Sequence, residues 1–358
     1  MVVGKALEHT GSGPPTGVGK KVKFCVFGAG AVGGFVGGMI ARKSGDVSLV
    51  TRGEHLKAIK KNGLKVIKSD EEFVVDVPAT DKPGELGIQD VIFLCTKTHS
   101  LHVAAHAIKP LIGSETVVVS AQNGIPFWYF HAHGDARDGH SLKTVDPGGE
   151  IAKAIGNQRV LGCVITSSNA VQAPGVVRNI GNQTFSLGEP DGSCSDRLKN
   201  VAALLEGAGL NAPIATDIRG EVWVKMWGNV SFSPMAVLTM SKLGPLVERE
   251  DLRALGITIM EEVQSVGEAL GVNFGATIES RLEGTRRVAG HKTSILQDLE
   301  SSRPMEVDGI TGAVVELGRL LDIKTPTIDV IYALMRQRAR EAGLYPEIGY
   351  DPLSDVVG

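Results

Sequence analysis

The stretch from Gly220 to Pro234 places polar side chains at a regular helical spacing. Glu221, Lys225 and Asn229 lie four residues apart, so they would share one face of a helix, which Ser233 would extend if the helix continues. Such a stripe can be a solvated face that carries a weak Glu–Lys pair. Bulky apolar residues surround it, however, and they favour a helix that is buried on more than one side. A buried ammonium and a buried amide need partners, so this face is a candidate site.

A second candidate lies between residues 22 and 50, where the pattern is strand, glycine-rich turn, helix and strand. We expect strands at Val22–Phe27 and Val47–Val50, and a helix from Ala31 to about Lys43. The turn has the spacing G-x-G-x-x-G, which alone could be just a glycine-rich turn but in this context is typical of dinucleotide binding. Its residues are Gly28, Ala29, Gly30, Ala31, Val32 and Gly33.

Each glycine of this turn has its own expected role. Gly28 permits the tight turn, Gly30 lets the backbone approach a pyrophosphate, and Gly33 lets the helix pack closely on the strand. The phosphates would lie against the free N–H groups at the start of the helix. Further glycines at positions 34, 37 and 38 lower helix propensity, so we expect close packing around this helix.

The end of the second strand indicates which cofactor would bind. An NAD site usually has an acidic residue there, which accepts a hydrogen bond from the ribose 2′-hydroxyl. Here Asp46 lies at the wrong end of the strand, and the next carboxylate is that of Glu54. Arg52 could pair with a 2′-phosphate and Thr51 could add a hydroxyl contact, although an exposed arginine at a strand end is common. We predict NADP(H) rather than NAD(H).

Two further polar residues follow expected strands of the same sheet. Lys97 ends the apolar run Asp90–Lys97, and Asn123 closely follows the run Thr116–Ser120. Ligands of open α/β sheets bind beyond the carboxyl ends of the strands, which is where both residues would lie. Each could be a solvated loop residue when taken alone. Together, beside a dinucleotide turn, they favour contact with a cofactor or a substrate.

The composition excludes several classes of protein. Of the 358 residues, 42% are hydrophobic and 22% are charged, and the net charge is −3. There is therefore no basic field to argue for nucleic acid or an anionic membrane. No apolar run reaches the ~20 residues that span a bilayer, and the N-terminus lacks the pattern of a secretory signal.

The four cysteines indicate a reducing compartment. Cys25, Cys95 and Cys163 lie in apolar runs, and neither they nor Cys194 form a C-x-x-C pair. They are typical of small buried residues rather than of disulfides or zinc ligands, so we expect a cytoplasmic protein.

We expect two domains between an N-terminal and a C-terminal tail. Residues 1–20 are rich in Gly, Pro and Ser and indicate a flexible tail. Residues 21–216 alternate strands, turns and helices, whereas residues 217–346 contain helical patterns, and residues 347–358 form a C-terminal tail. The predicted fold is an α/β Rossmann-type N-terminal domain plus an all-α C-terminal domain, with substrate in the cleft between them.

The first domain is expected to contain further elements in this order: a helix at 54–61, a strand pair within 64–77, strands at 90–97 and 116–120 with a helix up to about 109 between them, antiparallel strands at 160–167, 175–180 and 184–188, a helix at 197–206 and a strand at 214–216. The second domain is expected to contain helices at about 218–242, 248–270, 275–289, 305–321 and 326–341. Pro234 should bend or end the first of these helices.

The segment 129–158 is polar and weakly periodic. Its histidines, His131, His133 and His140, raise the question of a metal site. Their spacing matches no standard site, and histidines of surface loops are far commoner. We therefore predict no metal.

These residues together resemble the ketopantoate reductase (2-dehydropantoate 2-reductase) family over nearly the whole chain after the tail. That family combines an N-terminal Rossmann domain with a helical C-terminal domain related to that of 6-phosphogluconate dehydrogenase. The matching features occur in order in both domains. They are the glycine-rich turn at 28–33, Arg52, Lys97, Asn123, the pattern Glu-x-x-x-Lys-x-x-x-Asn at 221–229, the segment 293–298 and Glu306-Val307-Asp308.

The resemblance implies that hydride from NADPH reduces the ketone of a 2-oxo acid. Lys225 would then be the general acid that also stabilises the developing alkoxide. Glu306 would hold a substrate hydroxyl, balance the charge of the lysine and lie against the cofactor. Without the resemblance, Glu306 and Ser294 would be interpreted as an acid at a helix start and a capping or loop hydroxyl.

The resemblance also assigns the remaining contacts. Asn123 and Asn229 would position the substrate, and Asn123 would also lie near the nicotinamide. Ser294 would donate a hydrogen bond to the substrate carboxylate. Arg52 would bind the 2′-phosphate, and Lys97 would line the cofactor cleft.

One position departs from the family pattern. The family commonly has a second asparagine one turn after the first, where it helps to bind the substrate, and this chain has Ser233 there. A serine is shorter and has one donor where the amide has two. We keep Ser233 as a substrate-binding candidate, but the departure leaves the identity of the substrate open. The segment 129–158 is also longer than the family usually needs, and it could reshape the rim of the cleft.

Three functions therefore remain to be weighed. The first is reduction of 2-dehydropantoate to (R)-pantoate for pantothenate and coenzyme A synthesis. The second, motivated by Ser233, is a D-2-hydroxyacid dehydrogenase or another ketone reductase on the same scaffold. The third is a non-catalytic sensor of NADP(H), which would lack a catalytic group, whereas lysine, asparagine and glutamate are all present. We expect a homodimer formed through the helical domain.

Overall fold

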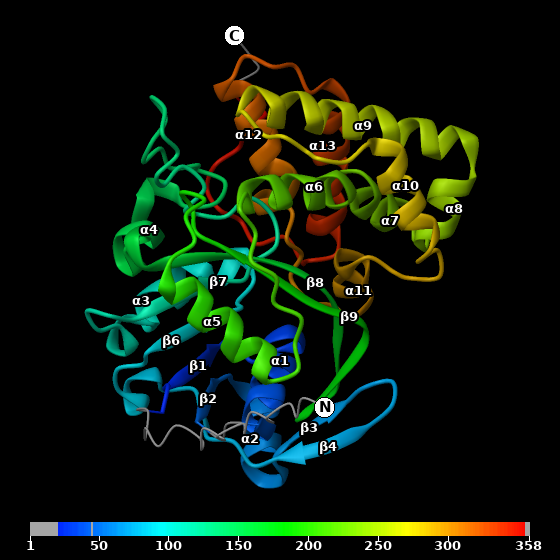
Figure 1. The fold of residues 1–358 in the computed structure, drawn as a ribbon. Coiled ribbons are helices and arrows are strands. Elements are labelled where there is room, and N and C mark those ends of the chain that lie inside the picture. Colours follow the sequence, from blue (N-terminus) through cyan, green and yellow to red (C-terminus); the bar gives the residue numbers. More distant parts are fainter. Residues whose placement is uncertain (1–20, 44–45, 355–358) are drawn as a thin grey trace, which may run out of the picture.

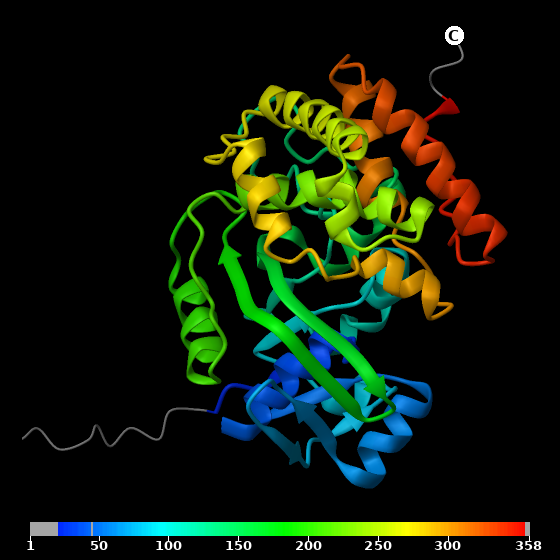
Figure 2. The ribbon, with the colours of Figure 1, turned by 90° about the vertical axis from the view of Figure 1, so that its right-hand side faces the viewer.

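The computed structural model describes residues 21–43 and 46–354, so the tail predicted at residues 1–20 lies outside the described residues. An α/β domain comes first and a helical domain follows, stacked one above the other (Figures 1 and 2). The predicted fold class is confirmed. The boundary at residues 216 and 217 stays a prediction.

Six parallel strands form the core of the sheet in the order β5-β2-β1-β6-β7-β8. This is the strand order of a Rossmann domain. The central strands are apolar throughout because both faces of the sheet are covered. The bounds are β1 Phe24–Phe27, β2 Val47–Val50, β5 Ala79–Thr80, β6 Val91–Leu94, β7 Val117–Ser120 and β8 Val160–Ala173.

Three more strands extend this sheet beyond β8. β9 (Val176–Gly188) pairs antiparallel with β8, β3 (Leu64–Ile67) pairs parallel with β9, and β4 (Glu72–Val75) forms the edge. The predicted pair within 64–77 is confirmed. The separate strands predicted at 175–180 and 184–188 are one long strand, whose irregular pairing with β8 includes two shifts of register. Figure 2 shows this hairpin running diagonally from the α/β domain to the helical domain.

Helix α1 (Ala31–Lys43) packs as closely on the sheet as its glycines predict. An added Cβ atom at Gly37 would lie 2.5 Å from a methyl carbon of Leu49, and one at Gly38 would lie 2.4 Å from a methyl carbon of Val66. A larger residue at either position would therefore push the helix off the sheet.

Four other α-helices belong to the α/β domain, and they are α2 Gly53–Asn62, α3 Leu101–Ala107, α4 Glu150–Ile155 and α5 Asp196–Gly207. The strand predicted at 214–216 is wrong. Ile214 makes only an isolated bridge with Leu187. Asp217 then accepts a hydrogen bond from the backbone N–H of Gly220 at 2.8 Å, so the chain turns at once into the next helix.

The helical domain contains eight α-helices, which are α6 Ile218–Val230, α7 Phe232–Thr239, α8 Leu243–Glu248, α9 Glu250–Ala269, α10 Ile278–Arg286, α11 Ser294–Glu300, α12 Ala313–Leu320 and α13 Pro326–Glu341. Three tryptophan side chains are almost fully buried, and two of them, Trp223 and Trp227, lie on α6. Helix α6 is therefore the buried centre of the domain. Among the described residues, none of the helices combines the length and the apolar character needed to cross a membrane.

The helix predicted at 218–242 is divided at Ser231 into α6 and α7. Pro234 explains the break, since it has no N–H to donate to the carbonyl of Val230 and its ring would clash with that carbonyl. At the break, the carbonyl of Trp227 accepts both the hydroxyl of Ser231 at 2.5 Å and its backbone N–H at 3.2 Å. Proline thus ends the helix, as predicted.

The helix predicted at 305–321 begins later than expected. The helical turns start with a π-helical turn at Asp308–Gly312, which leads into α12. The hydroxyls of Tyr332 and Tyr345 both donate to Oδ1 of Asp308, at 2.6 and 2.8 Å. Glu306 therefore lies before the helix, in a segment held by its neighbours rather than by helical hydrogen bonds.

Candidate active site

A cavity of about 630 Å³ lies between the sheet and α6. Residues 164–166 of β8 and the segment that leads into α6 line one part of it, and the polar face of α6 lines another. Glu221, Lys225 and Asn229 all line this cavity, as their spacing predicts. The two domains therefore meet in a cleft that carries the candidate residues of the helical stripe.

Lys225 is the cationic centre of this cleft. Its Nζ donates a hydrogen bond of 2.6 Å to Oδ1 of Asn123, which follows β7 in the other domain. Burial lowers the pKa of Lys225 to about 8, while the negative charge of Glu306 acts in the opposite direction. A lysine of this kind is still protonated at neutral pH and gives up its proton more readily than an exposed one.

Glu306 is buried where the segment before α12 meets Thr98 of the α/β domain. Its Oε1 accepts hydrogen bonds from the backbone N–H of Thr98 at 2.9 Å and from the hydroxyl of Thr98 at 3.2 Å. Burial raises the pKa of Glu306, and the backbone hydrogen bond from Thr98 opposes that change. Glu306 lines a different cavity, of about 380 Å³, rather than the cavity of α6.

Backbone contact between the domains fixes the positions of Asn123 and Glu306. The N–H of Ile125 donates to the carbonyl of Gly309 at 3.0 Å. Gly124 has a φ of +84°, and an added Cβ there would lie 2.1 Å from the same carbonyl oxygen. Only glycine fits at this point, so the loop after β7 lies directly against the π-helical turn.

Lys97 lies at the domain interface. Its ammonium forms an ion pair with the buried carboxylate of Asp298 on α11 and donates to the carbonyl of Pro304 at 3.0 Å. Asp298 also pairs with Nε of Arg303 at 3.0 Å. In this structure the ammonium of Lys97 thus holds the α/β domain against α11, and its role toward a cofactor stays a prediction.

The glycine-rich turn has the geometry that a dinucleotide needs. Gly28 has a φ of +99°, and an added Cβ at Gly33 would lie 2.4 Å from the carbonyl oxygen of Gly28. By contrast, no atom lies within 4 Å of an added Cβ at Gly30, so this part of the backbone is open to a ligand. The first turn of α1 carries no acidic residue that would repel a phosphate.

The two residues that directly follow β2, Thr51 and Arg52, include a cation and no acid. Arg52 is exposed and directly precedes α2. The nearest following carboxylate, that of Glu54, pairs with Nζ of Lys57 at 2.7 Å. These residues fit an adenosine moiety that carries a 2′-phosphate.

Three predicted substrate-binding residues, Asn123, Ser233 and Ser294, do not line the cavity beside Lys225, although Asn123 accepts a hydrogen bond from Lys225. Ser233 is buried inside α7, and Ser294 is exposed at the first position of α11, after the capping residue Thr293. Their roles stay predictions. Sequence reasoning missed Asn273 and Arg281, which are among the polar residues that do line the cavity. Neither belongs to the periodic stripe of α6, so the spacing carried no signal for them.

The segment 129–158 packs beside α6 rather than forming a loose loop. The hydroxyl of Tyr129 accepts a hydrogen bond of 2.7 Å from Nε1 of Trp223, and Nε of Arg219 donates to the carbonyl of Tyr129 at 2.8 Å. None of its residues lines the cavity beside Lys225. The segment thus helps to position the first turns of α6.

In the part of the chain that the structure describes, no three side chains of metal-binding type come together.

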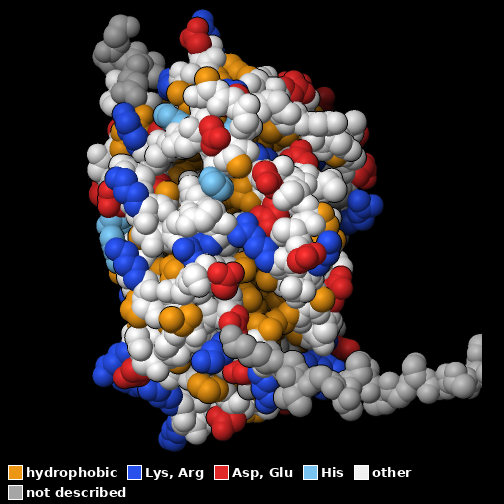
Figure 3. All heavy atoms as spheres, turned by 60° about the vertical axis from the view of Figure 1, so that its left-hand side comes forward, with side chains coloured by type: hydrophobic (Ala, Val, Ile, Leu, Met, Phe, Trp, Pro, Cys, Tyr) orange, Lys and Arg blue, Asp and Glu red, His pale blue; other side chains and the backbone are white. Residues whose placement is uncertain are grey.

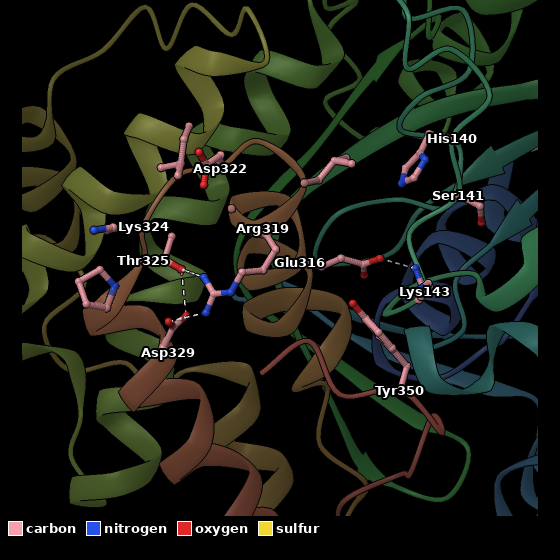
Figure 4. Close-up of a pocket in the computed structure, with 14 residues that line it drawn as sticks. His140, Ser141, Lys143, Glu316, Arg319, Asp322, Lys324, Thr325, Asp329 and Tyr350 are labelled. Carbon is pink, nitrogen blue, oxygen red and sulfur yellow. Dashed lines mark hydrogen bonds and ion pairs between the residues drawn. The ribbon is translucent and has the colours of Figure 1, made fainter. Parts of the chain in front are cut away.

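A further cavity of about 740 Å³ lies between α12, α13 and the loop around residue 141 (Figure 4). Some of its charged groups already have partners. Glu316 accepts from the backbone N–H groups of Lys143 and Thr144 at 2.7 and 2.8 Å, and Arg319 pairs with Asp329 at 2.5 Å. This cavity holds none of the predicted site residues.

Elsewhere on the surface, Figure 3 shows acidic and basic side chains mixed over the face in view.

Comparison with known proteins agrees with this arrangement. A family model described as ketopantoate reductase PanE/ApbA matches residues 24–137, and one described as its C-terminal part matches residues 217–339. A 2-dehydropantoate 2-reductase from Mesorhizobium japonicum is 49% identical over 325 residues, which cover 90% of this chain and 100% of that protein. One from Pyrococcus horikoshii is 26% identical and covers 90% and 99%.

Solved structures show the same architecture. A chain from Ralstonia solanacearum, provisionally identified as a ketopantoate reductase, has a TM-score of 0.86 at 35% identity, covering 91% of this chain and 100% of that one. D-mandelate dehydrogenase in complex with NADH and anilino(oxo)acetate has a TM-score of 0.77 at 22% identity, covering 90% and 99%, and shares the fold. Because family models match both domains and a relative matches nearly the full chain, the protein belongs to the ketopantoate reductase family.

Proposed function

We propose that the protein is an NADPH-dependent 2-dehydropantoate 2-reductase, which forms (R)-pantoate for pantothenate and coenzyme A biosynthesis. The observation that carries this proposal is the ammonium of Lys225, which lies in the cleft with its hydrogen bond of 2.6 Å to Asn123. The relative from Mesorhizobium japonicum, which is named for this reaction, supports the choice of substrate.

The α/β domain would hold the cofactor through backbone and side chain. The open backbone at Gly30 and the N–H groups at the start of α1 would receive the pyrophosphate. Arg52 would pair with the 2′-phosphate, which favours NADPH over NADH. When bound, the cofactor supplies the hydride for the keto carbon.

Lys225 would act on the keto oxygen. As negative charge develops on that oxygen, the ammonium would stabilise it and donate a proton to it. The lowered pKa, about 8, favours this proton transfer, and the hydrogen bond to Asn123 orients the ammonium. Glu306 would moderate the charge of the lysine and accept from a substrate hydroxyl. Asn229, one turn after Lys225, would fix the substrate in the same cavity.

A second candidate function is that of a D-2-hydroxyacid dehydrogenase with another 2-oxo acid. Ser233 favours it, because serine stands where the family commonly has a second asparagine. In this structure Ser233 is buried within α7, so its hydroxyl would reach substrate only if α7 moved.

The test is NADPH oxidation with 2-dehydropantoate, run beside pyruvate, 2-oxoisovalerate and phenylglyoxylate. We expect 2-dehydropantoate to have a kcat/KM at least about 100-fold above the others, since each lost polar contact costs roughly one order of magnitude. Reduction of phenylglyoxylate alone would support the second candidate. An enzyme that binds NADPH and reduces none of the four would refute both.

A further inference from the structure

Arg281 reaches from α10 into the same cavity as Lys225 and Asn229. Its Nε is buried without a hydrogen-bond partner. Within residues 21–43 and 46–354, its guanidinium enters no ion pair or side-chain hydrogen bond. Other arginines of this domain, such as Arg319 and Arg336, pair with carboxylates. Arg281 is thus a cation held in a cleft without an anion.

The backbone of α6 makes room for this guanidinium. An ideal Cβ added at Gly228 would lie 2.5 Å from Nη2 of Arg281 and 3.4 Å from its Cζ. Gly228 lies three residues after Lys225, so the guanidinium rests on the face of α6 that carries Lys225, and both line the cavity together with Asn229. Any side chain at position 228 would displace it.

The charges around the cavity do not neutralise Arg281. Burial lowers its pKa, and its positive charge in turn lowers the pKa of Lys225. Two carboxylates line the same cavity, but Asp217 caps the start of α6 and Glu221 forms no ion pair with Arg281. Two desolvated cations facing one cavity are unfavourable until an anion enters between them.

We propose that Arg281 binds the carboxylate of the 2-oxo acid substrate, an inference that rests on the proposed reductase function. A guanidinium presents two parallel N–H donors to a carboxylate, whereas a serine hydroxyl presents one. Ser294, to which the sequence resemblance assigns this contact, is exposed on α11 and does not line the cavity. With its carboxylate on Arg281, a 2-oxo acid would place its adjacent keto oxygen toward Lys225.

The first test measures binding without turnover. Calorimetry would give the Kd of (R)-pantoate, the product anion, for the protein saturated with NADP⁺. Arg281→Met keeps the apolar stem and removes the charge, and it should raise this Kd about 30-fold or more. Arg287→Met, at the exposed end of α10, is the matched control and should leave it within about 2-fold. The uncharged (R)-pantolactone should bind both variants as it binds wild type.

The second test moves Arg281 without replacing it. Gly228→Ala places a methyl group only 2.5 Å from Nη2 of Arg281, so the guanidinium must move and the affinity for (R)-pantoate should fall while the affinity for NADPH is kept. Gly284→Ala, the same change on α10 with no atom closer than 4.0 Å, is the control. Glu221→Gln tests the alternative that Arg281 acts on Glu221 rather than on the substrate. If Arg281 serves Glu221 rather than the substrate, this variant should reproduce the loss seen with Arg281→Met, and the proposal would be wrong.

The outcomes separate this inference from the proposed function. If wild type binds (R)-pantoate and Arg281→Met binds it within about 3-fold, the role of Arg281 is refuted while the reductase function stands. If wild type binds (R)-mandelate and not (R)-pantoate, the proposed substrate is wrong, and the same variants decide the role of Arg281 with mandelate. If wild type binds neither acid, both proposals fail.

Discussion

Nζ of Lys225 and Oδ1 of Asn123, 102 residues apart in the sequence, are joined by a hydrogen bond of 2.6 Å that links the two domains. One residue comes from the centre of the helical domain and the other from the carboxyl end of a sheet strand. An ammonium has three donors, so this bond orients Lys225 and leaves two protons available to a substrate. Both the proposed chemistry and the first predictions below depend on this arrangement.

Removing the ammonium should abolish most of the turnover. We expect Lys225→Ala to lower kcat by about 10²- to 10⁴-fold, because it removes the proton donor and the charge that stabilises the alkoxide. The Kd of NADPH, measured by fluorescence titration, should stay close to that of wild type. Lys242→Ala, an exposed lysine before α8, is the control. Turnover near the wild-type rate in Lys225→Ala would refute the assignment.

The activity should fall on the alkaline side of neutrality. The pKa of Lys225 is lowered from 10.5 to about 8. The side chain is therefore fully protonated well below pH 8 and loses its proton as the pH rises through that value. A plot of kcat/KM against pH should therefore decrease above about pH 8, in proportion to the loss of one proton. Lys225→Arg, which stays charged, should lose this decrease if it retains activity. An unchanged alkaline limb in that variant would assign the limb to another group.

Arg52 should decide between the two nicotinamide cofactors. Arg52→Ala is expected to raise the KM for NADPH by roughly 10- to 100-fold, the usual loss for a charge-assisted contact, and to change the KM for NADH little. Lys57→Ala, another exposed cation one turn further along α2, should affect neither. Equal changes for both cofactors would argue against a contact with the 2′-phosphate.

Two glycines of the same turn should respond in opposite ways. Gly33→Ala forces a Cβ to within 2.4 Å of the carbonyl of Gly28 and should lower the free energy of unfolding by about 1–3 kcal/mol. Gly30→Ala meets no atom within 4 Å, so it should keep the wild-type Tm yet weaken NADPH binding. Thermal unfolding and cofactor titration of both variants would check this. A loss of stability in Gly30→Ala would contradict it.

The ion pair between Lys97 and Asp298 should stabilise the contact between the domains. Asp298→Asn leaves two cations, Lys97 and Arg303, without a counter-charge, and we expect a loss of about 1–3 kcal/mol in urea unfolding. Glu300→Gln, on the same helix, breaks the more exposed pair with Lys292 and should cost less than about 1 kcal/mol. Equal losses in the two variants would contradict a structural role for Asp298.

Local patterns predicted much of this structure because local physics determines it. The apolar runs became the parallel strands, and the four-residue spacing placed Glu221, Lys225 and Asn229 in one cavity. Pro234 ended its helix through its missing N–H. The resemblance to a known family added what spacing could not, since Glu306 alone has no pattern that sets it apart.

The rest depends on contacts between distant parts of the chain. Glu306 is held by Thr98, 208 residues away, and its segment stays outside the helix because of the π-helical turn that follows. Arg281 enters the cavity from α10, and the space for it at Gly228 becomes visible only when α6 and α10 are packed together. Such tertiary contacts leave no periodic trace in a single sequence.

The backbone contact of Gly124 with Gly309 also limits how the two halves of the molecule can move. No side chain lies between the two backbones there, and the hydrogen bond from Ile125 to Gly309 is 3.0 Å long. A rotation of the helical domain that kept this bond would have to use the contact as its fulcrum. Asn123 directly precedes Gly124, so the keto group of a bound substrate would lie close to the axis of this rotation. At that place, a closing movement of the two domains would change the width of the cleft least.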